Sequence, residues 1–210
     1  MPKIDFEPKL DFEQVLIRPK RSELNSRNDV DLTRTITFKN GQTWTGVPVI
    51  AANMSTTGTF NIYDSLAKHK MITALHKFYT LDDYKKQMET GDGLNPDFFM
   101  VSTGISSADY DKLCNIVDAI PCKWICIDIA NGYIKLFLDF CKKVRARYPN
   151  HIIVAGNVAT REMVETLLIE GDVDVVKVGI GPGSVCTTRK KTGVGMPQLS
   201  CVLECADAAH

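Results

Sequence analysis

The 210-residue sequence lacks an excess of charge of either sign, because its 25 basic residues equal its 25 acidic ones. A chain without net charge has no general attraction for nucleic acid or for an anionic membrane surface. An anionic ligand must therefore be held by a local arrangement of side chains. We expect no nucleic-acid partner and no membrane partner.

Long apolar runs are missing as well. No segment approaches the roughly 18 apolar residues of a membrane span, and the opening MPKIDFEPKL is charged where a signal peptide needs an apolar core. The seven cysteines are an odd number and lie within apolar segments, which suits free thiols in a reducing compartment. We expect a cytoplasmic protein without disulfides.

Two kinds of segment alternate along the chain. Short apolar runs recur about every 25 residues and are typical of buried parallel strands; they cover 47–52, 71–75, 98–102, 124–128, 151–155 and 173–179. The segments between them have helical periodicity, and two begin with a capping box, Thr80 ahead of Asp83 and Ser106 ahead of Asp109. Repeated strand-helix units predict an α/β fold.

The sequence also lacks the GxGxxG fingerprint that marks the open dinucleotide-binding sheet. Polar residues instead follow the predicted strands, as at the catalytic rim of a (β/α)8 TIM barrel. We therefore predict that residues 47–210 supply about six units of such a barrel as a single domain, preceded by an irregular N-terminal arm over 1–46. Since a closed barrel has eight strands, residues 1–210 stop two units short of one, either as part of a longer protein or as a fragment.

The segment KVGIGPGSVCTTR, residues 177–189, places a cysteine after a glycine-rich loop and shortly before a predicted helix. Glycines let backbone groups approach a ligand closely, and helix N–H groups with Arg189 would favour the thiolate of Cys186. Thr187 and Thr188 add hydroxyls nearby. From these residues alone, a nucleophile and a packed cysteine in a simple turn remain open alternatives.

Three other sites carry a functional and a structural interpretation side by side. Asp128 ends a buried run and either faces the barrel mouth or caps a loop. Lys77 follows the second predicted strand and either faces a cofactor or points to solvent. The basic arm around Arg27 is either a solvated face or a clamp on phosphate. Cys201 and Cys205 are interpreted as core thiols.

Six segments together resemble the IMP dehydrogenase/GMP reductase family, and its reductase branch in particular: KLDFEQVLIRPKRS, AANMSTTGTF, ALHKFY, CIDIANGY, AGNVATREM and KVGIGPGSVCTTRKKTGVGMPQLS. The resemblance implies a homotetrameric barrel enzyme that reduces GMP to IMP and ammonia with NADPH. It implies that Cys186 attacks carbon 2 of the purine and forms a covalent thioimidate, and that Thr188 moves the proton that lets ammonia leave.

The same resemblance implies two binding sites. A monovalent cation, K⁺, would be bound at Gly181, Gly183, Cys186 and Arg189. The cofactor would contact Ser26, Arg27, Lys77, Asp128, Ile129, Ala130, Ile180 and Gly181.

Two alternatives to the reductase stay open. One is oxidation of IMP with NAD, although only residues 78–97 occupy the interval in which such siblings usually carry a regulatory insert. The other is a non-catalytic family member that binds nucleotide or partner subunits. Ser55, Phe78 and Met196 depart from the family pattern, which has Asp, His and Tyr there. Because the phosphate-binding loops and the acid of the family lie further on, we expect residues 1–210 alone to be inactive.

Overall fold

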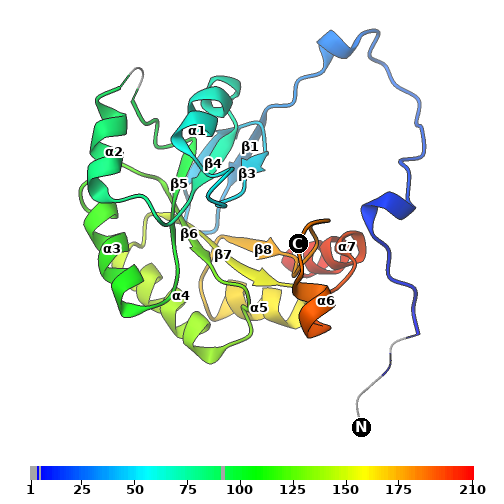
Figure 1. Ribbon diagram of the computed structural model, residues 1–210. Helices are drawn as coiled ribbons and strands as arrows, with labels where there is room; N and C mark the ends of the chain where they lie inside the picture. Colours follow the sequence, from blue (N-terminus) through cyan, green and yellow to red (C-terminus); the bar gives the residue numbers. More distant parts are fainter. Residues whose placement is uncertain (1–3, 5, 91–92) are drawn as a thin grey trace.

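A computed structural model describes residue 4 and residues 6–90 and 93–210. Its central element is a parallel sheet with the strand order β3-β4-β5-β6-β7-β8, so each strand lies beside its neighbour in the sequence. The strands are β3 (Ile50–Ala51), β4 (Ile72–Leu75), β5 (Phe99–Thr103), β6 (Trp124–Asp128), β7 (Ile152–Val158) and β8 (Val175–Val178). Each predicted apolar run overlaps one of these strands, although β5 and β7 extend past the predicted ends, and Figure 1 shows the sheet curling into part of a barrel.

The helices follow the strands and cover the outer side of the curled sheet (Figure 1). They are α1 (Phe60–Leu66), α2 (Leu81–Met88), α3 (Ser107–Val117), α4 (Lys135–Arg147), α5 (Arg161–Ile169), α6 (Thr188–Thr192) and α7 (Gln198–Ala209), with a short 3-10 turn η3 (Ala67–His69) after α1. Both predicted capping boxes are confirmed, with Thr80 starting α2 and Ser106 starting α3.

Both faces of the sheet are buried, which explains why the strands read as continuous apolar runs. Along β6, Ile125 and Ile127 pack in the outer core against the helices, whereas Trp124 and Cys126 pack in an inner core. The same alternation holds in the other strands, because successive side chains of a strand point to opposite faces. Residues of one parity therefore line the barrel interior.

Part of the arm that we expected to be irregular forms a hairpin, and the irregular assignment is wrong there. Strands β1 (Arg34–Thr37) and β2 (Thr43–Gly46) pair antiparallel, and Gly41 in the turn has a φ of +82°. Trp44 of β2 stacks edge-on against Trp124, with ring centroids 6.0 Å apart. The hairpin thus covers the inner core at the amino ends of the strands.

The rest of the described arm holds two 3-10 turns, η1 (Phe12–Gln14) and η2 (Arg27–Asp29), and arches away from the barrel (Figure 1). It returns to the barrel at α7, where Leu10 N–H donates to Ser200 Oγ (2.8 Å) and Ser200 N–H to Leu10 O (3.1 Å). Arm residues 1–3 and 5 lie outside the described residues.

Two general properties accompany this fold. Within the described ranges, no helix combines the length and the apolar character needed to cross a membrane. All seven cysteines are free thiols, four of them buried and Cys186 half-buried.

Candidate functional site

The carboxyl ends of the strands gather most of the polar residues that the sequence singled out. Asp128 is the last residue of β6, Lys77 follows β4, and the cysteine loop follows β8. Because all six strands are parallel, these positions lie at one end of the barrel. We call this end the mouth.

The segment 179–187, which we call the cysteine loop, connects β8 to α6. Gly181 has a φ of +63°, a conformation that favours glycine, and Cys186 N–H donates to Gly183 O (2.9 Å). Thr188 is the first residue of α6, and its Oγ1 lies 3.3 Å from Cys186 Sγ. Of the two neighbouring hydroxyls that the sequence places near the thiol, that of Thr188 is therefore in contact with it.

This geometry favours ionisation of the thiol. The neutral Cys186 thiol donates to Thr188 Oγ1, and the same hydroxyl donates to the sulfur once it is ionised. Hydrogen bonding to this hydroxyl and then to the Thr188 backbone lowers the pKa of Cys186 below its ordinary value, with a smaller contribution from the charge of Arg189. Burial has the opposite effect on other cysteines and raises the pKa of Cys126 to about 11 and that of Cys122 to about 12. Among these three thiols, Cys186 is the one suited to act as a nucleophile.

Arg189 holds the cysteine loop together from within. Its Nε donates to Ile180 O (3.2 Å), another of its nitrogens donates to Met196 O, and a third lies 3.3 Å from Asp11 Oδ2. The other Asp11 oxygen accepts from Gln198 N–H at the start of α7. The N-terminal arm is thus tied to the cysteine loop through one carboxylate and one guanidinium.

A second polar cluster lies at the mouth inside the barrel. Lys177 of β8 forms an ion pair with Asp128 of β6, and its Nζ also donates to Asn53 Oδ1 (2.9 Å) after β3. A buried carboxylate costs free energy unless it is paired or reaches solvent, and Asp128 has both a partner and a place at the mouth.

Some of the other predicted cofactor residues lie at the mouth, and the two in the N-terminal arm do not. Lys77 is exposed near the mouth, with its Nζ 3.5 Å from Asp109 Oδ1. The main chain of each isoleucine is held by a hydrogen bond. Ile129 N–H donates to Gly156 O, and Ile180 O accepts from the side chain of Arg189. Ser26 and Arg27 belong to η2 in the outlying arm, and the structure does not bring them to the mouth of this chain.

Two cavities adjoin the cysteine loop. One of about 380 Å³ lies between the loop and η1 and is lined by Cys186, Asp11 and Glu13, among others. The other, of about 650 Å³, is lined by Ile180, Met196 and residues that follow β6 and β7. Space for a ligand is therefore available on either side of the loop.

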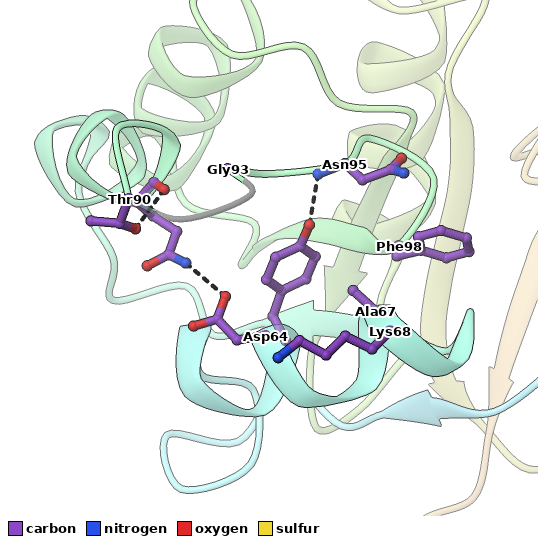
Figure 2. Close-up of a pocket in the computed structure, with 9 residues that line it drawn as sticks. Asp64, Ala67, Lys68, Thr90, Gly93, Asn95 and Phe98 are labelled. Atoms are coloured by element: carbon purple, nitrogen blue, oxygen red, sulfur yellow. Dashed lines mark hydrogen bonds between the residues drawn. The ribbon is translucent and has the colours of Figure 1, made fainter.

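A further cavity, of about 460 Å³, lies between α1 and the segment that follows α2 (Figure 2). Four of its polar residues are paired: Gln87 Nε2 donates to Asp64 Oδ1 (2.9 Å), and Asn95 N–H donates to the Tyr63 hydroxyl (2.6 Å). Phe98, just before β5, also lines it. The cavity is thus near the amino end of β5, and no predicted site residue lines it.

Sequence reasoning missed two residues of this site. Lys177 stands inside the apolar run VVKVGI, where burying an unpaired charge costs free energy. A lysine among valines therefore indicates that its ammonium group has a partner. Asp11 gave no comparable signal, because an acidic residue in a polar arm is unremarkable until the arm is placed on α7.

The fold and the site define the class of this protein: an α/β-barrel protein that carries a cysteine of lowered pKa in a loop at the carboxyl ends of its parallel strands. The chain belongs to the IMP dehydrogenase / GMP reductase family, whose domain profile matches residues 9–210. It is 56% identical to a GMP reductase of Ascaris suum and to GMP reductase 2 of Homo sapiens, over all of this chain and 60% of each relative. The chain thus spans about three fifths of the length of these relatives.

A solved structure supports the fold assignment. An inosine 5′-monophosphate dehydrogenase from Legionella pneumophila matches 95% of this chain and 59% of its own with a TM-score of 0.81, at 31% identity. The predicted partial barrel is thereby confirmed.

Proposed function

We propose that this protein is a GMP reductase that converts GMP to IMP and ammonia with NADPH. The observation that carries the proposal is the activated Cys186 beside Thr188 at the barrel mouth. The choice of reductase over IMP dehydrogenase rests on identity, which is 54–56% to several GMP reductases and 31% to the Legionella dehydrogenase.

Cys186 serves as the nucleophile in this proposal. Its sulfur adds to carbon 2 of the purine, and the bond from carbon 2 to the amino nitrogen breaks, so that ammonia leaves and a covalent thioimidate remains. Thr188, at 3.3 Å from the sulfur, relays the proton that the departing nitrogen needs. NADPH supplies a hydride to carbon 2, after which the carbon-sulfur bond breaks and IMP is released.

The proposed cofactor residues lie along the mouth. The Lys77 ammonium is exposed there and suits a phosphate or carboxamide. Asp128 ends β6, and Ile129 and Ala130 follow it. All three would border the cofactor, with Ile180 and Gly181 on the facing loop. Since Ser26 and Arg27 do not reach this mouth, we propose that they bind the adenine-ribose end of a cofactor held by a neighbouring copy in a homotetramer.

The cysteine loop also suits a monovalent cation. K⁺ favours carbonyl oxygens, and the sharply turned loop offers those of Gly181, Gly183 and Cys186. The guanidinium of Arg189 is a donor, so this residue would contribute its carbonyl while its side chain fixes the loop. A cation there would hold the loop in the conformation that presents the thiol.

A cytoplasmic location completes the proposal. The seven free thiols support it. Fractionating the cells that make the protein would test it.

Replacing the nucleophile tests the proposed function. In the intact natural protein, Cys186→Ala should abolish GMP-dependent oxidation of NADPH, followed by absorbance, while GMP binding is retained. Cys114→Ala is the matched control, because Cys114 is also half-buried but lies on α3, and its activity should equal that of the wild type. Turnover that survives in Cys186→Ala contradicts the mechanism, and reduction of NAD with IMP as the preferred reaction contradicts the substrate assignment.

A further inference from the structure

Three residues lie side by side at the inner edge of the mouth. Asp128 of β6 is the register partner of Gly156 of β7, and Gly156 is the partner of Lys177 of β8. Register partners in a sheet point to the same face. All three positions share the parity of the inner core residues Cys126 and Val154, so they face the barrel interior.

The middle position of this row has no side chain. Two strands that flank a third are about 10 Å apart, and a side chain on the middle strand would stand between their side chains. A Cβ built on Gly156 would come within 2.5 Å of Lys177 Cβ. Because Gly156 leaves that space open, Lys177 reaches over β7 and pairs with Asp128.

Lys177 also connects the two edge strands of the sheet, β3 and β8. Its Nζ donates to Asn53 Oδ1 at 2.9 Å, and Asn53 follows β3, which is the first strand in the order whose last strand is β8. One ammonium group thereby connects the carboxyl ends of β3, β6 and β8. These are three of the six strand ends that form the mouth.

Packing does not explain a lysine at this position. The neighbouring residues of β8 are valines, and an ammonium group in an apolar strand costs free energy unless it is paired. The side chains of Lys177 and Asp128 are only 27% and 31% exposed, so their attraction is partly protected from solvent. The pair uses one oxygen of Asp128, and the other has no hydrogen-bond partner among the described residues.

We propose that Lys177 is a positioning residue of the mouth, which orients the carboxylate of Asp128 and the amide of Asn53 so that the free Asp128 oxygen faces the cofactor. The proposal rests on the proposed function, in which Asp128 borders NADPH. Lys177 itself need not touch the cofactor. Gly156 is the structural condition for the arrangement.

The test compares NADPH binding by variants of the intact natural protein. Lys177→Met keeps the length of the side chain and removes its charge. We expect its Kd for NADPH, measured by fluorescence titration, to rise about tenfold, the size of a typical coupling between contacting groups. Asp128→Asn should weaken binding to a similar extent, and the double variant no further. Lys177→Arg should recover most of the affinity.

A matched control uses another lysine-carboxylate pair. Lys142 on α4 lies 3.4 Å from Glu170, with both side chains about half exposed on the outer side of the barrel. Lys142→Met should leave the Kd for NADPH unchanged. Thermal unfolding of all variants shows whether any loss of binding merely follows a loss of folded protein.

The outcomes separate this proposal from the proposed function. An unchanged Kd in Lys177→Met, or effects of Lys177→Met and Asp128→Asn that simply add, overturns the positioning role. A loss of binding that tracks the unfolding midpoint and is not recovered in Lys177→Arg overturns it too. Protein that binds NADPH but does not reduce GMP contradicts the proposed function, while the Kd series still decides the role of Lys177.

Discussion

At the scale of single residues, the site depends on how the pKa of one thiol differs from that of five others in the same chain. Burial alone makes a thiol harder to ionise, and the pKa of Cys141 is raised to about 12 for this reason. Cys186 departs in the opposite direction because the Thr188 hydroxyl donates to its ionised sulfur. The contrast comes from two residues that are two positions apart, so the sequence already places the hydroxyl beside the thiol, although it leaves a nucleophile and a packed cysteine as open alternatives.

Thr188→Val tests this account by removing the hydroxyl while keeping the shape of the side chain. The pKa of Cys186 should rise, so its thiolate fraction at pH 7 and its alkylation by iodoacetamide should fall several-fold, since one pKa unit is a tenfold change. Peptide mapping by mass spectrometry at a series of pH values would show the alkylation curve of Cys186 moving to higher pH. Thr166→Val on α5 is the control. An unmoved curve in Thr188→Val contradicts the assignment.

At the scale of secondary-structure elements, the sequence predicted what repeats and missed what occurs once. The six strands and the capped helices α2 and α3 were predictable because burial on both faces and capping boxes leave local patterns. The pairing of Lys177 with Asp128 was not, because it depends on register across β7. The link from Asp11 to Arg189 spans 178 positions, which no local pattern reveals.

The missed hairpin did leave a signal. Asn40-Gly41 stands between RTITF and TWTG, and an Asn-Gly pair between alternating residues is a strong hairpin pattern. We propose that residues 1–46 form an arm and that residues 47–210 form one barrel domain. The hairpin at the end of the arm packs against that domain. Trp44 is its main anchor, since it is 3% exposed and its Nε1 donates to Asp97 O (2.9 Å).

Removing that anchor should destabilise the whole barrel. Trp44→Ala leaves a cavity against Trp124 and an unpaired Asp97 carbonyl, so we expect a loss of about 3–5 kcal/mol in the free energy of unfolding. Ile36→Ala on β1, where the side chain is 38% exposed, should cost less than about 1 kcal/mol. Urea titration followed by fluorescence and far-UV circular dichroism measures both. A separate early transition for the hairpin would contradict its place in the barrel core.

At the scale of the whole molecule, the sheet has two open edges. Among the described residues, β3 pairs only with β4, and β8 pairs only with β7. Beside β8, an apolar cavity of about 390 Å³ opens between α5 and α7, lined by Val164, Val176 and Val202, among others. An unpaired strand next to an apolar hollow is a template for pairing with another chain. Barrels avoid this by closing on themselves.

We therefore predict that residues 1–210, produced alone, associate through these edges and do not reduce GMP. Size-exclusion chromatography with light scattering should show masses well above that of one chain, increasing with concentration. The comparison protein is the same chain fused to the part of human GMP reductase 2 that the match leaves uncovered. Because that part would supply partners for β3 and β8, the fusion should give one defined oligomer, and GMP-dependent oxidation of NADPH should appear with it. A stable single-chain species of residues 1–210 would show that the open edges are protected within this chain.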